Sequence, residues 1–480
     1  MRRAGRRALI VLGTLVLLAL AAGGYALYAA SRRPAGLSAA GRCSLGAWEL
    51  PDGALFAVRQ REGETLRVVF LDGRSPAVYP RDDGRYVSEA VGADGRTPSA
   101  VLHTSTCGED HLSLAVDGGE PQTARRVPLE QRDTSFAGGD VQLAGRLVLP
   151  PGGATVPIAV LVHGSERDSA LDGSHWQFLL PARGIGAFVY DKRGTGRSGG
   201  DYTQDFEVLA ADANAAAAEA RRLAGARAGE VGYFGGSQGG WVAPLAALRG
   251  RGDFVIAAYG LAESPLAEDR EEVLLGLREA GFADAATRRK ALEVTAATGA
   301  VMASRFTEGF DAVAAVKAKY GGEPWFDALE GEFTGTFVRY PAWVLRALGP
   351  RLDVGTSWSY EPVPTLEAVA VPHLWVLAGD DHEAPSDTTL AILREVQRRR
   401  PNLDVARFPA ADHGMLVTRR SADGKELGRD YAAGYHDLVL GWLRTRSLAG
   451  AAAGIETWEG SGGGPRVAAA PGATAPPPVE

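Results

Sequence analysis

Apolar runs that alternate with helical patterns constrain the fold of this 480-residue chain more than any other feature. VQLAGRLVLP predicts an entering strand, and six later runs have the length of buried strands: VPIAVLVHG, GIGAFVYD, EVGYFGG, DFVIAAYG, HLWVLAG and LDVARFP. Apolar strands that alternate with helices form a mainly parallel sheet with helices on both faces. We therefore predict an α/β domain over residues 133–447.

A long segment interrupts this alternation between DFVIAAYG and HLWVLAG. It covers about residues 264–366, and its pattern is helical. An insertion of this size between two core strands is most simply a helical cap. Its aromatic residues would either line a substrate pocket or form the core of the cap itself: Trp325, Phe326, Tyr340, Trp343, Trp358 and Tyr360.

The regions before and after this domain differ from it in composition and in the pattern of apolar residues. Short apolar pieces separated by Gly, Asp and Pro turns predict a small antiparallel β-rich domain over residues 43–130. It holds both cysteines, Cys43 and Cys107, which would pair in an oxidising compartment or remain two unrelated buried thiols. Residues 451–480 are rich in Gly, Ala and Pro, which predicts a disordered tail.

The N-terminus carries a membrane-targeting pattern. Residues 1–7 contain four arginines, and residues 8–30 contain no charge. At ~1.5 Å per residue, a helix of this length crosses a ~30 Å hydrocarbon core, whereas signal-peptide apolar regions are usually about 7–15 residues long. We expect a single-pass anchor in a bacterial-type inner membrane, with the rest of the chain exported to the periplasm or beyond. Cleavage near Ala26 or Ala40 is the alternative.

The stretch GYFGGSQGGW places Ser237 between two pairs of glycines. Such a stretch is either a flexible Gly-Ser loop or a strained turn that holds a nucleophile. It satisfies G-x-S-x-G between a predicted strand and a predicted helix, a context in which the serine hydroxyl is exposed above the sheet. The helix that follows also directs its N-terminal N–H groups towards that hydroxyl.

A nucleophilic serine needs a base, and the base needs an acid that orients it. Among the eight histidines, His413 follows a late strand directly, where its ring could reach the carboxyl edge of the sheet. The loop GDDHEAP follows the preceding strand and supplies candidate acids. The chain order is then serine, acid and histidine, each after its own strand, which favours a catalytic triad.

Five motifs in this order resemble the α/β-hydrolase superfamily: LVHGS, YDKRGTGRS, GGSQGG, GDDHEAP and DHG. The similarity covers about residues 133–443 and is greatest to bacterial enzymes related to serine aminopeptidases and carboxylesterases. It implies Ser237 as nucleophile and His413 as general base. The family pattern G-x-D-x-x-x-P implies that the acid is Asp381 rather than Asp380.

The resemblance also implies an oxyanion hole, made by the backbone N–H groups of Gln238 and Ser165. His163 would brace its loop, and Asp191 and Arg193 would hold the turn DKRGTGRSGG, which lacks a phosphate-binding pattern. No cofactor is expected. A zinc site in the loop GDDHEAP is disfavoured because adjacent side chains converge poorly on one ion.

We therefore predict a serine hydrolase that cleaves carboxylic esters through an acyl-enzyme, with a small-molecule ester or short peptide as substrate. The net charge of -7 argues against nucleic acid as a partner. An aminopeptidase-like amide hydrolase is the alternative, with Glu263, Glu268 or Asp269 holding the substrate amine. An alternative of another class is a non-catalytic binding module on the same fold. The oligomeric state stays open.

Overall fold

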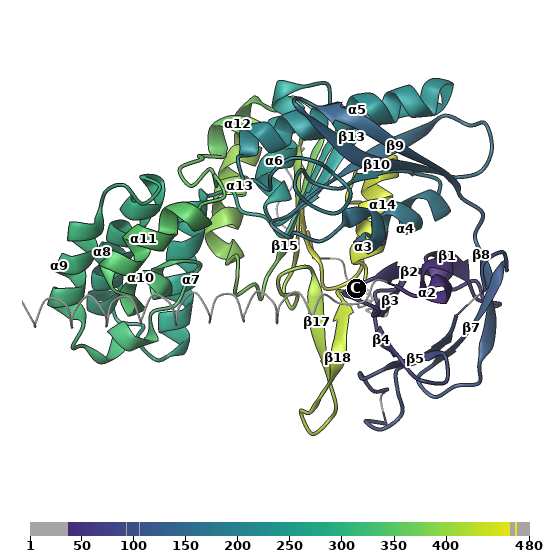
Figure 1. The fold of residues 1–480 in the computed structure, drawn as a ribbon, viewed down its shortest axis with the longest axis horizontal. Helices are drawn as coiled ribbons and strands as arrows, with labels where there is room; N and C mark the ends of the chain where they lie inside the picture. The colour runs from purple at the N-terminus through teal and green to yellow at the C-terminus, as the bar shows by residue number, and fades with distance from the viewer. Residues whose placement is uncertain (1–36, 93, 105, 461–465, 468–480) are drawn as a thin grey trace, which may run out of the picture.

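The computed structural model describes residues 37–92, 94–104, 106–460 and 466–467 (Figure 1). The predicted anchor at residues 8–30, with its basic segment 1–7, lies outside these residues. Among the helices of the described part, none is long and apolar enough to cross a membrane. A barrel is followed along the chain by a sheet domain, into which a helical lobe is inserted.

The N-terminal domain is a closed antiparallel barrel, in which each strand pairs with the next and the first also pairs with the last. A short helix, α2 (Ala39–Ser44), precedes its strands β1 (Gly46–Glu49), β2 (Leu55–Gln60), β3 (Leu66–Phe70), β4 (Ala77–Pro80), β5 (Arg85–Ser88), β6 (Ala100–His103), β7 (His111–Val116) and β8 (Gln122–Arg126). Trp48, Phe56 and Phe70 fill its core. A disulfide joins Cys43 to Cys107, which confirms the predicted pairing.

A ten-stranded sheet forms the centre of the described part of the molecule, in the order β20-β19-β16-β15-β14-β13-β11-β12-β10-β9. Its strands are β9 (Glu130–Gly138), β10 (Val141–Leu149), β11 (Val156–Val162), β12 (Gly186–Tyr190), β13 (Ala228–Gly236), β14 (Val255–Ala258), β15 (His373–Ala378), β16 (Leu403–Phe408), β19 (Glu456–Trp458) and β20 (Arg466–Val467). The middle strands, from β12 to β16, pair in parallel. The seven strands predicted from apolar runs are β10 to β16.

Helices cover both faces of this sheet because its strands are apolar on both sides. Along β11, Val160 packs into one core and its neighbour Leu161 into the opposite one. The first face carries α5 (Phe206–Ala224), α6 (Gly239–Arg249), α12 (Val363–Ala368) and α13 (Ser386–Arg399). The second carries α3 (Ala170–Gly173), α4 (Trp176–Ala182) and α14 (Tyr435–Thr445).

Two of the strands that the sequence analysis missed lie towards the two ends of the sheet. The first, β9, pairs with β10 along its whole length, so the boundary between barrel and sheet domain falls at residues 127–129. The second, β19, pairs with β16 and lies in the segment predicted to be disordered. That prediction is wrong for residues 451–460, because Ile455 and Trp458 are buried against the sheet domain. The remaining tail residues, apart from 466–467, lie outside the described part.

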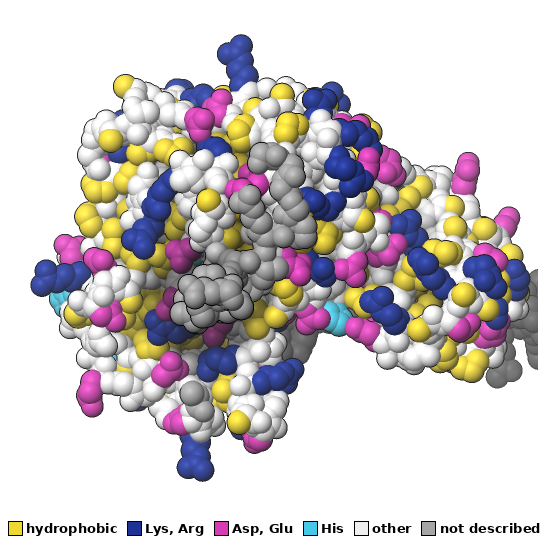
Figure 2. All heavy atoms as spheres, turned by 180° about the vertical axis from the view of Figure 1, so that it is seen from behind, with side chains coloured by type: hydrophobic (Ala, Val, Ile, Leu, Met, Phe, Trp, Pro, Cys, Tyr) yellow, Lys and Arg dark blue, Asp and Glu magenta, His cyan; other side chains and the backbone are white. Residues whose placement is uncertain are grey.

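The predicted helical cap projects from the sheet domain as a separate lobe, visible from both sides (Figures 1 and 2). It contains α7 (Pro265–Glu279), α8 (Ala285–Ala303), α9 (Phe310–Tyr320), α10 (Thr334–Arg339) and α11 (Ala342–Leu352), while α12 already packs on the sheet. Trp325 and Phe326 lie in the core of the lobe, whereas Tyr340 and Trp343 are exposed. Both alternatives therefore hold, for different residues: Trp325 and Phe326 form the core of the cap, whereas Tyr340 and Trp358 line a groove in it.

The barrel is docked on the sheet domain through apolar and polar contacts. Leu55 and Val69 of the barrel share a buried cluster with Phe178 and Leu179 of α4. The hairpin made by β17 (Leu416–Arg420) and β18 (Glu426–Tyr431) bonds to the barrel backbone. This hairpin starts directly after the loop that holds His413.

Candidate active site

Ser237 lies in the tight turn between β13 and α6, at the carboxyl edge of the sheet. Its φ of 52° is in the left-handed region, which a non-glycine residue rarely adopts. A Cβ on Gly235 would overlap the carbonyl of Gly239, and one on Gly236 would overlap the Tyr259 hydroxyl. The glycines before the serine are thus required by close approach across the turn, and the flexible-loop alternative is wrong.

Three of the predicted site residues meet at this turn. The Ser237 Oγ lies 3.0 Å from Nε2 of His413, and Nδ1 of the same ring lies 2.9 Å from Oδ2 of Asp381. The Asp381 side chain is almost fully buried, and its Oδ1 accepts hydrogen bonds from the backbone N–H groups of Glu383 and Ala384. These bonds fix the carboxylate behind the imidazole.

The neighbours of Asp381 point elsewhere. Asp380 is exposed, and its carboxylate lies 3.5 Å from His382, which in turn lies 3.3 Å from Glu279 of the cap. Among the described residues, no group of three or more potential ligands could hold a metal ion. The acidic loop thus directs Asp381 to Nδ1 of His413 and Asp380 towards His382 and the cap.

His413 sits in a largely buried, negatively charged environment. Burial lowers the pKa of its imidazole, but the hydrogen bond and charge of Asp381, with the charge of Glu383, outweigh burial and raise it above the ordinary value. Glu383 lies 3.5 Å from Nε2, on the side that faces the serine. The ring of Tyr259 packs edge-on against His413. Tyr259 was not singled out as a site residue from the sequence, and Glu383 entered only as one of the candidate acids of the loop GDDHEAP.

The two backbone N–H groups predicted for an oxyanion hole flank the serine. Gln238 is the N-cap of α6, and within the described residues neither its N–H nor that of Ser165 donates to another protein group. The loop of Ser165 is held firmly: Lys192 donates to the carbonyl of Gly164, and Tyr202 donates to that of Ser165. Burial lowers the pKa of Lys192 to about 8.

The turn DKRGTGRSGG is structural, as the sequence predicted. Asp191 is fully buried and accepts hydrogen bonds from Ser169, Leu171 and Arg197. Arg193 forms a two-point ion pair with Asp212 on α5. His163 is buried edge-on against Tyr190 and braces its loop.

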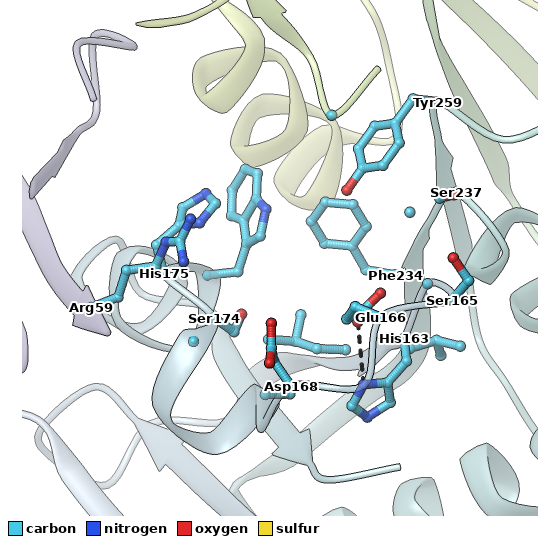
Figure 3. A pocket seen from close by; sticks show the side chains of 18 of the residues that line it. Arg59, His163, Ser165, Glu166, Asp168, Ser174, His175, Phe234, Ser237 and Tyr259 are labelled. Atoms are coloured by element: carbon cyan, nitrogen blue, oxygen red, sulfur yellow. Dashed lines mark ion pairs between the residues drawn. The ribbon is translucent and has the colours of Figure 1, made fainter. Parts of the chain in front are cut away.

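Two cavities open on either side of Ser237. The larger, of about 480 Å³, extends from Ser237 and His413 towards the barrel (Figure 3). The smaller, of about 180 Å³, extends towards the cap and is lined by Ser165 and Gln238 together with three carboxylates, of Glu268, Glu332 and Glu383. The serine is therefore accessible from both the barrel side and the cap side.

A parallel sheet flanked by helices, with a serine in a strand–turn–helix at its carboxyl edge, defines the α/β-hydrolase class of fold. A comparison with protein families matches residues 159–423 to the alpha/beta hydrolase family. The chain belongs to this family, and the fold predicted from the sequence, with its cap and N-terminal β domain, is confirmed.

The solved structures that are similar to this chain are distant in sequence. An acylaminoacyl peptidase of Pyrococcus horikoshii is 15% identical, with a TM-score of 0.39, over 75% of this chain and 52% of that one. The chain thus spans about half the length of that peptidase. The Pyrococcus furiosus esterase Pf2001 is 14% identical, with a TM-score of 0.38, over 59% of this chain and 84% of that one. Est1E of Butyrivibrio proteoclasticus, solved with ferulic acid, is 15% identical, with a TM-score of 0.35, over 65% and 96%. No curated protein matches the sequence.

Proposed function

We propose that the protein is a serine hydrolase that cleaves carboxylic esters through an acyl-enzyme. The observation that carries this proposal is the continuous hydrogen-bonded chain from Ser237 through His413 to Asp381. In the proposed reaction, Nε2 of His413 takes the proton of the serine hydroxyl as Oγ attacks the ester carbonyl. The N–H groups of Gln238 and Ser165 stabilise the negative charge on the carbonyl oxygen.

The tetrahedral intermediate then collapses, and His413 returns the proton to the departing alcohol. A water molecule attacks the acyl-enzyme by the same route and releases the carboxylic acid. Asp381 keeps the imidazole in the tautomer that accepts at Nε2, and its charge stabilises the imidazolium during each transfer.

An apolar groove supports an ester with an apolar chain as the first choice of substrate. The groove has a volume of about 610 Å³ and lies in the cap, where Phe306, Phe337 and Leu348 line it. Trp358 and Glu332 line both this groove and the cap-side cavity at Ser237. An acyl or alkyl chain could therefore extend from the serine into the cap.

Labelling by a fluorophosphonate probe tests the proposal, together with turnover of 4-nitrophenyl esters of increasing chain length. We expect stoichiometric labelling at Ser237 and hydrolysis of at least the medium-chain esters. A folded protein that neither reacts with the probe nor turns over any ester would instead be a binding module.

Ester hydrolysis should depend on pH through the protonation state of His413. His413 must be neutral to act as a base, and its pKa is raised above the ordinary 6.5 by Asp381 and Glu383 against the effect of burial. Activity should therefore rise with pH and reach half its plateau above pH 6.5. In Asp381→Asn the midpoint should fall, because burial, which lowers the pKa, then acts with less opposition. Profiles of kcat/KM check both midpoints, and a wild-type midpoint below 6.5 would contradict the assignment of the base.

A second candidate is an amide hydrolase that binds a free substrate amine. Three carboxylates, of Glu268, Glu332 and Glu383, line the cap-side cavity beside Ser237. Burial raises the pKa of Glu268 well above its ordinary range, and the like charges of its acidic neighbours raise it further. A bound ammonium group would relieve this repulsion.

The other two acids named for this role from the sequence are engaged elsewhere. Glu263 pairs with Arg270, and burial together with the charge of Glu271 raises its pKa to about 7 against the effect of Arg270. Asp269 accepts hydrogen bonds from the backbone N–H groups of Phe333 and Thr334. Of the three predicted residues, Glu268 alone lines the cavity at the serine.

Glu268→Gln separates the two candidates. If the amine is bound there, kcat/KM for aminoacyl 4-nitroanilides should fall by roughly 10- to 100-fold, the usual effect of losing a charge-assisted hydrogen bond. The N-acetylated anilides and neutral esters should be unaffected. Glu279→Gln, on the same helix but outside the cavity, is the matched control. Equal kinetics for free and acetylated substrates in the wild type would remove this candidate.

A further inference from the structure

The barrel contributes two arginines to the cavity that contains Ser237. Arg59 is on β2 and Arg61 follows it, and both line the larger cavity together with Ser237 and His413. Figure 3 shows Arg59 reaching from the barrel strand towards His175, on the side of the cavity opposite Ser237. The end of the cavity that faces the barrel is thus positively charged.

These arginines have no carboxylate partner in the part of the chain that the structure describes. An Arg59 Nη1 group donates to the adjacent carbonyl of Gln60, and its Nε is buried with no acceptor. Arg61 donates to the hydroxyl of Tyr79. By contrast, Arg74 and Arg85, also in the barrel, each pair with an aspartate two residues away.

A third arginine increases the concentration of positive charge. Arg67 lies directly opposite Arg59 on the antiparallel strand β3, and its Nε is likewise buried with no acceptor in the described residues. Like charges directly opposite on paired strands are destabilising. Burial lowers the pKa of the Arg67 guanidinium. The charges of Arg59 and Arg61 lower it further, whereas the interaction with Tyr431 raises it. An anion bound in the cavity would compensate this repulsion.

Other charged and titratable groups that face the cavity do not neutralise the arginines. Burial lowers the pKa of His175 well below its ordinary value, and the charges of His436, Arg59 and Arg67 lower it further. The carboxylates of the same cavity belong to Glu166, Asp168 and Glu383. Glu166 lies 3.5 Å from His163, and none of these three acids pairs with an arginine of the barrel within the described part.

We propose that Arg59 and Arg61 bind an anionic group of the substrate, a carboxylate or a phosphate, while the ester bond lies at Ser237. This inference rests on the proposed function and specifies its substrate class. A guanidinium is suited to the role, because its planar fork donates two parallel hydrogen bonds to either kind of oxyanion. The substrate would then be an ester with a negative charge at the end that faces the barrel.

Paired substrates test this proposal on the full-length enzyme. Mono-4-nitrophenyl glutarate carries the charge on the acyl side and is compared with 4-nitrophenyl pentanoate. The butyrate ester of 4-hydroxybenzoate carries it on the leaving group and is compared with phenyl butyrate. In Arg59→Gln, kcat/KM for the charged member of one pair should fall by about 10- to 100-fold, with the neutral member unchanged. Arg61→Gln, at an exposed position, should show a smaller loss of the same selectivity.

Arg85→Gln is the matched control, because Arg85 is a barrel arginine outside the cavity that already pairs with Asp83. Binding without turnover gives a second measurement. Glutarate and inorganic phosphate, compared at equal ionic strength, should raise the melting temperature of the wild type and of Arg85→Gln but not of Arg59→Gln. The anion that stabilises more strongly distinguishes a carboxylate from a phosphate site.

The outcomes separate the two proposals. If neutral esters are hydrolysed but Arg59→Gln changes charged and neutral substrates equally in both pairs, the anion site is wrong and the hydrolase proposal stands. If no ester is hydrolysed, the hydrolase proposal fails. The melting temperatures then test the anion site alone, and it is wrong if the anions stabilise the wild type and Arg59→Gln equally or stabilise neither.

Discussion

Ser237→Ala should reduce ester turnover by about 10⁵- to 10⁶-fold and abolish labelling by a fluorophosphonate probe, without unfolding the protein. The hydroxyl is the group that would form the acyl-enzyme, and its Oγ lies 3.0 Å from the imidazole that would take its proton. Alanine fits the same turn, although the left-handed φ of 52° stays strained. Turnover, labelling and circular dichroism of the purified variant give the three measurements.

The double variant provides the control for this prediction. Because residues of a triad act as a unit, Ser237→Ala combined with His413→Ala should be barely slower than either change alone. If the loss of turnover in the double variant instead equalled the product of the two single losses, the residues would act independently. Substantial acyl-enzyme turnover in Ser237→Ala would contradict the assignment of the nucleophile.

Asp381→Asn should reduce turnover by up to about 10⁴-fold and leave the fold intact. The carboxylate accepts from Nδ1 of His413 at 2.9 Å, and an amide in its place can present its NH₂ group and favour the wrong imidazole tautomer. The matched control is Asp380→Asn, in the adjacent position of the same loop. Asp380 is exposed and contacts His382 instead, so its loss should cost far less. Steady-state kinetics with one neutral ester compares the two.

An acid that follows the neighbouring strand β14 would be the rival for the orienting role. Glu263 is the nearest carboxylate after that strand in the sequence, and it pairs with Arg270. Glu263→Gln should therefore leave the pH dependence of turnover unchanged. Near-normal turnover in Asp381→Asn, together with a collapse in Glu263→Gln, would transfer the orienting role to Glu263.

The sheet and the three hydrogen-bonded residues could be predicted because local sequence determines both. Each strand from β10 to β16 is marked by its own apolar run, and Ser237, Asp381 and His413 each follow one of these strands. The carboxyl ends of parallel strands meet at one edge of the sheet, so strand order alone brings the three residues together. The glycines of GGSQGG mark the turn for the same local reason.

Features that depend on contacts between distant segments were missed. The strand β9 is rich in exposed polar residues, so its sequence shows no buried run. The strand β19 lies in a Gly- and Ala-rich tail, where Ile455 and Trp458 were the available signal. Arg59 resembles any surface arginine in the sequence, and its place in the cavity depends on how the barrel docks. Tertiary packing, rather than local sequence, determines the two strands and the position of Arg59.

The hairpin β17–β18 links the evolution of the sheet domain to that of the barrel. It begins directly after the His413 loop, and its backbone bonds to the barrel at Gly73 and Val91, while Asp430 accepts from the N–H of Ser75. A gene fragment that started at β9 would encode Ser237, His413 and Asp381 but none of these barrel residues. Exchange of the barrel by recombination would remove these contacts, so we expect the barrel and the sheet domain to have diverged together.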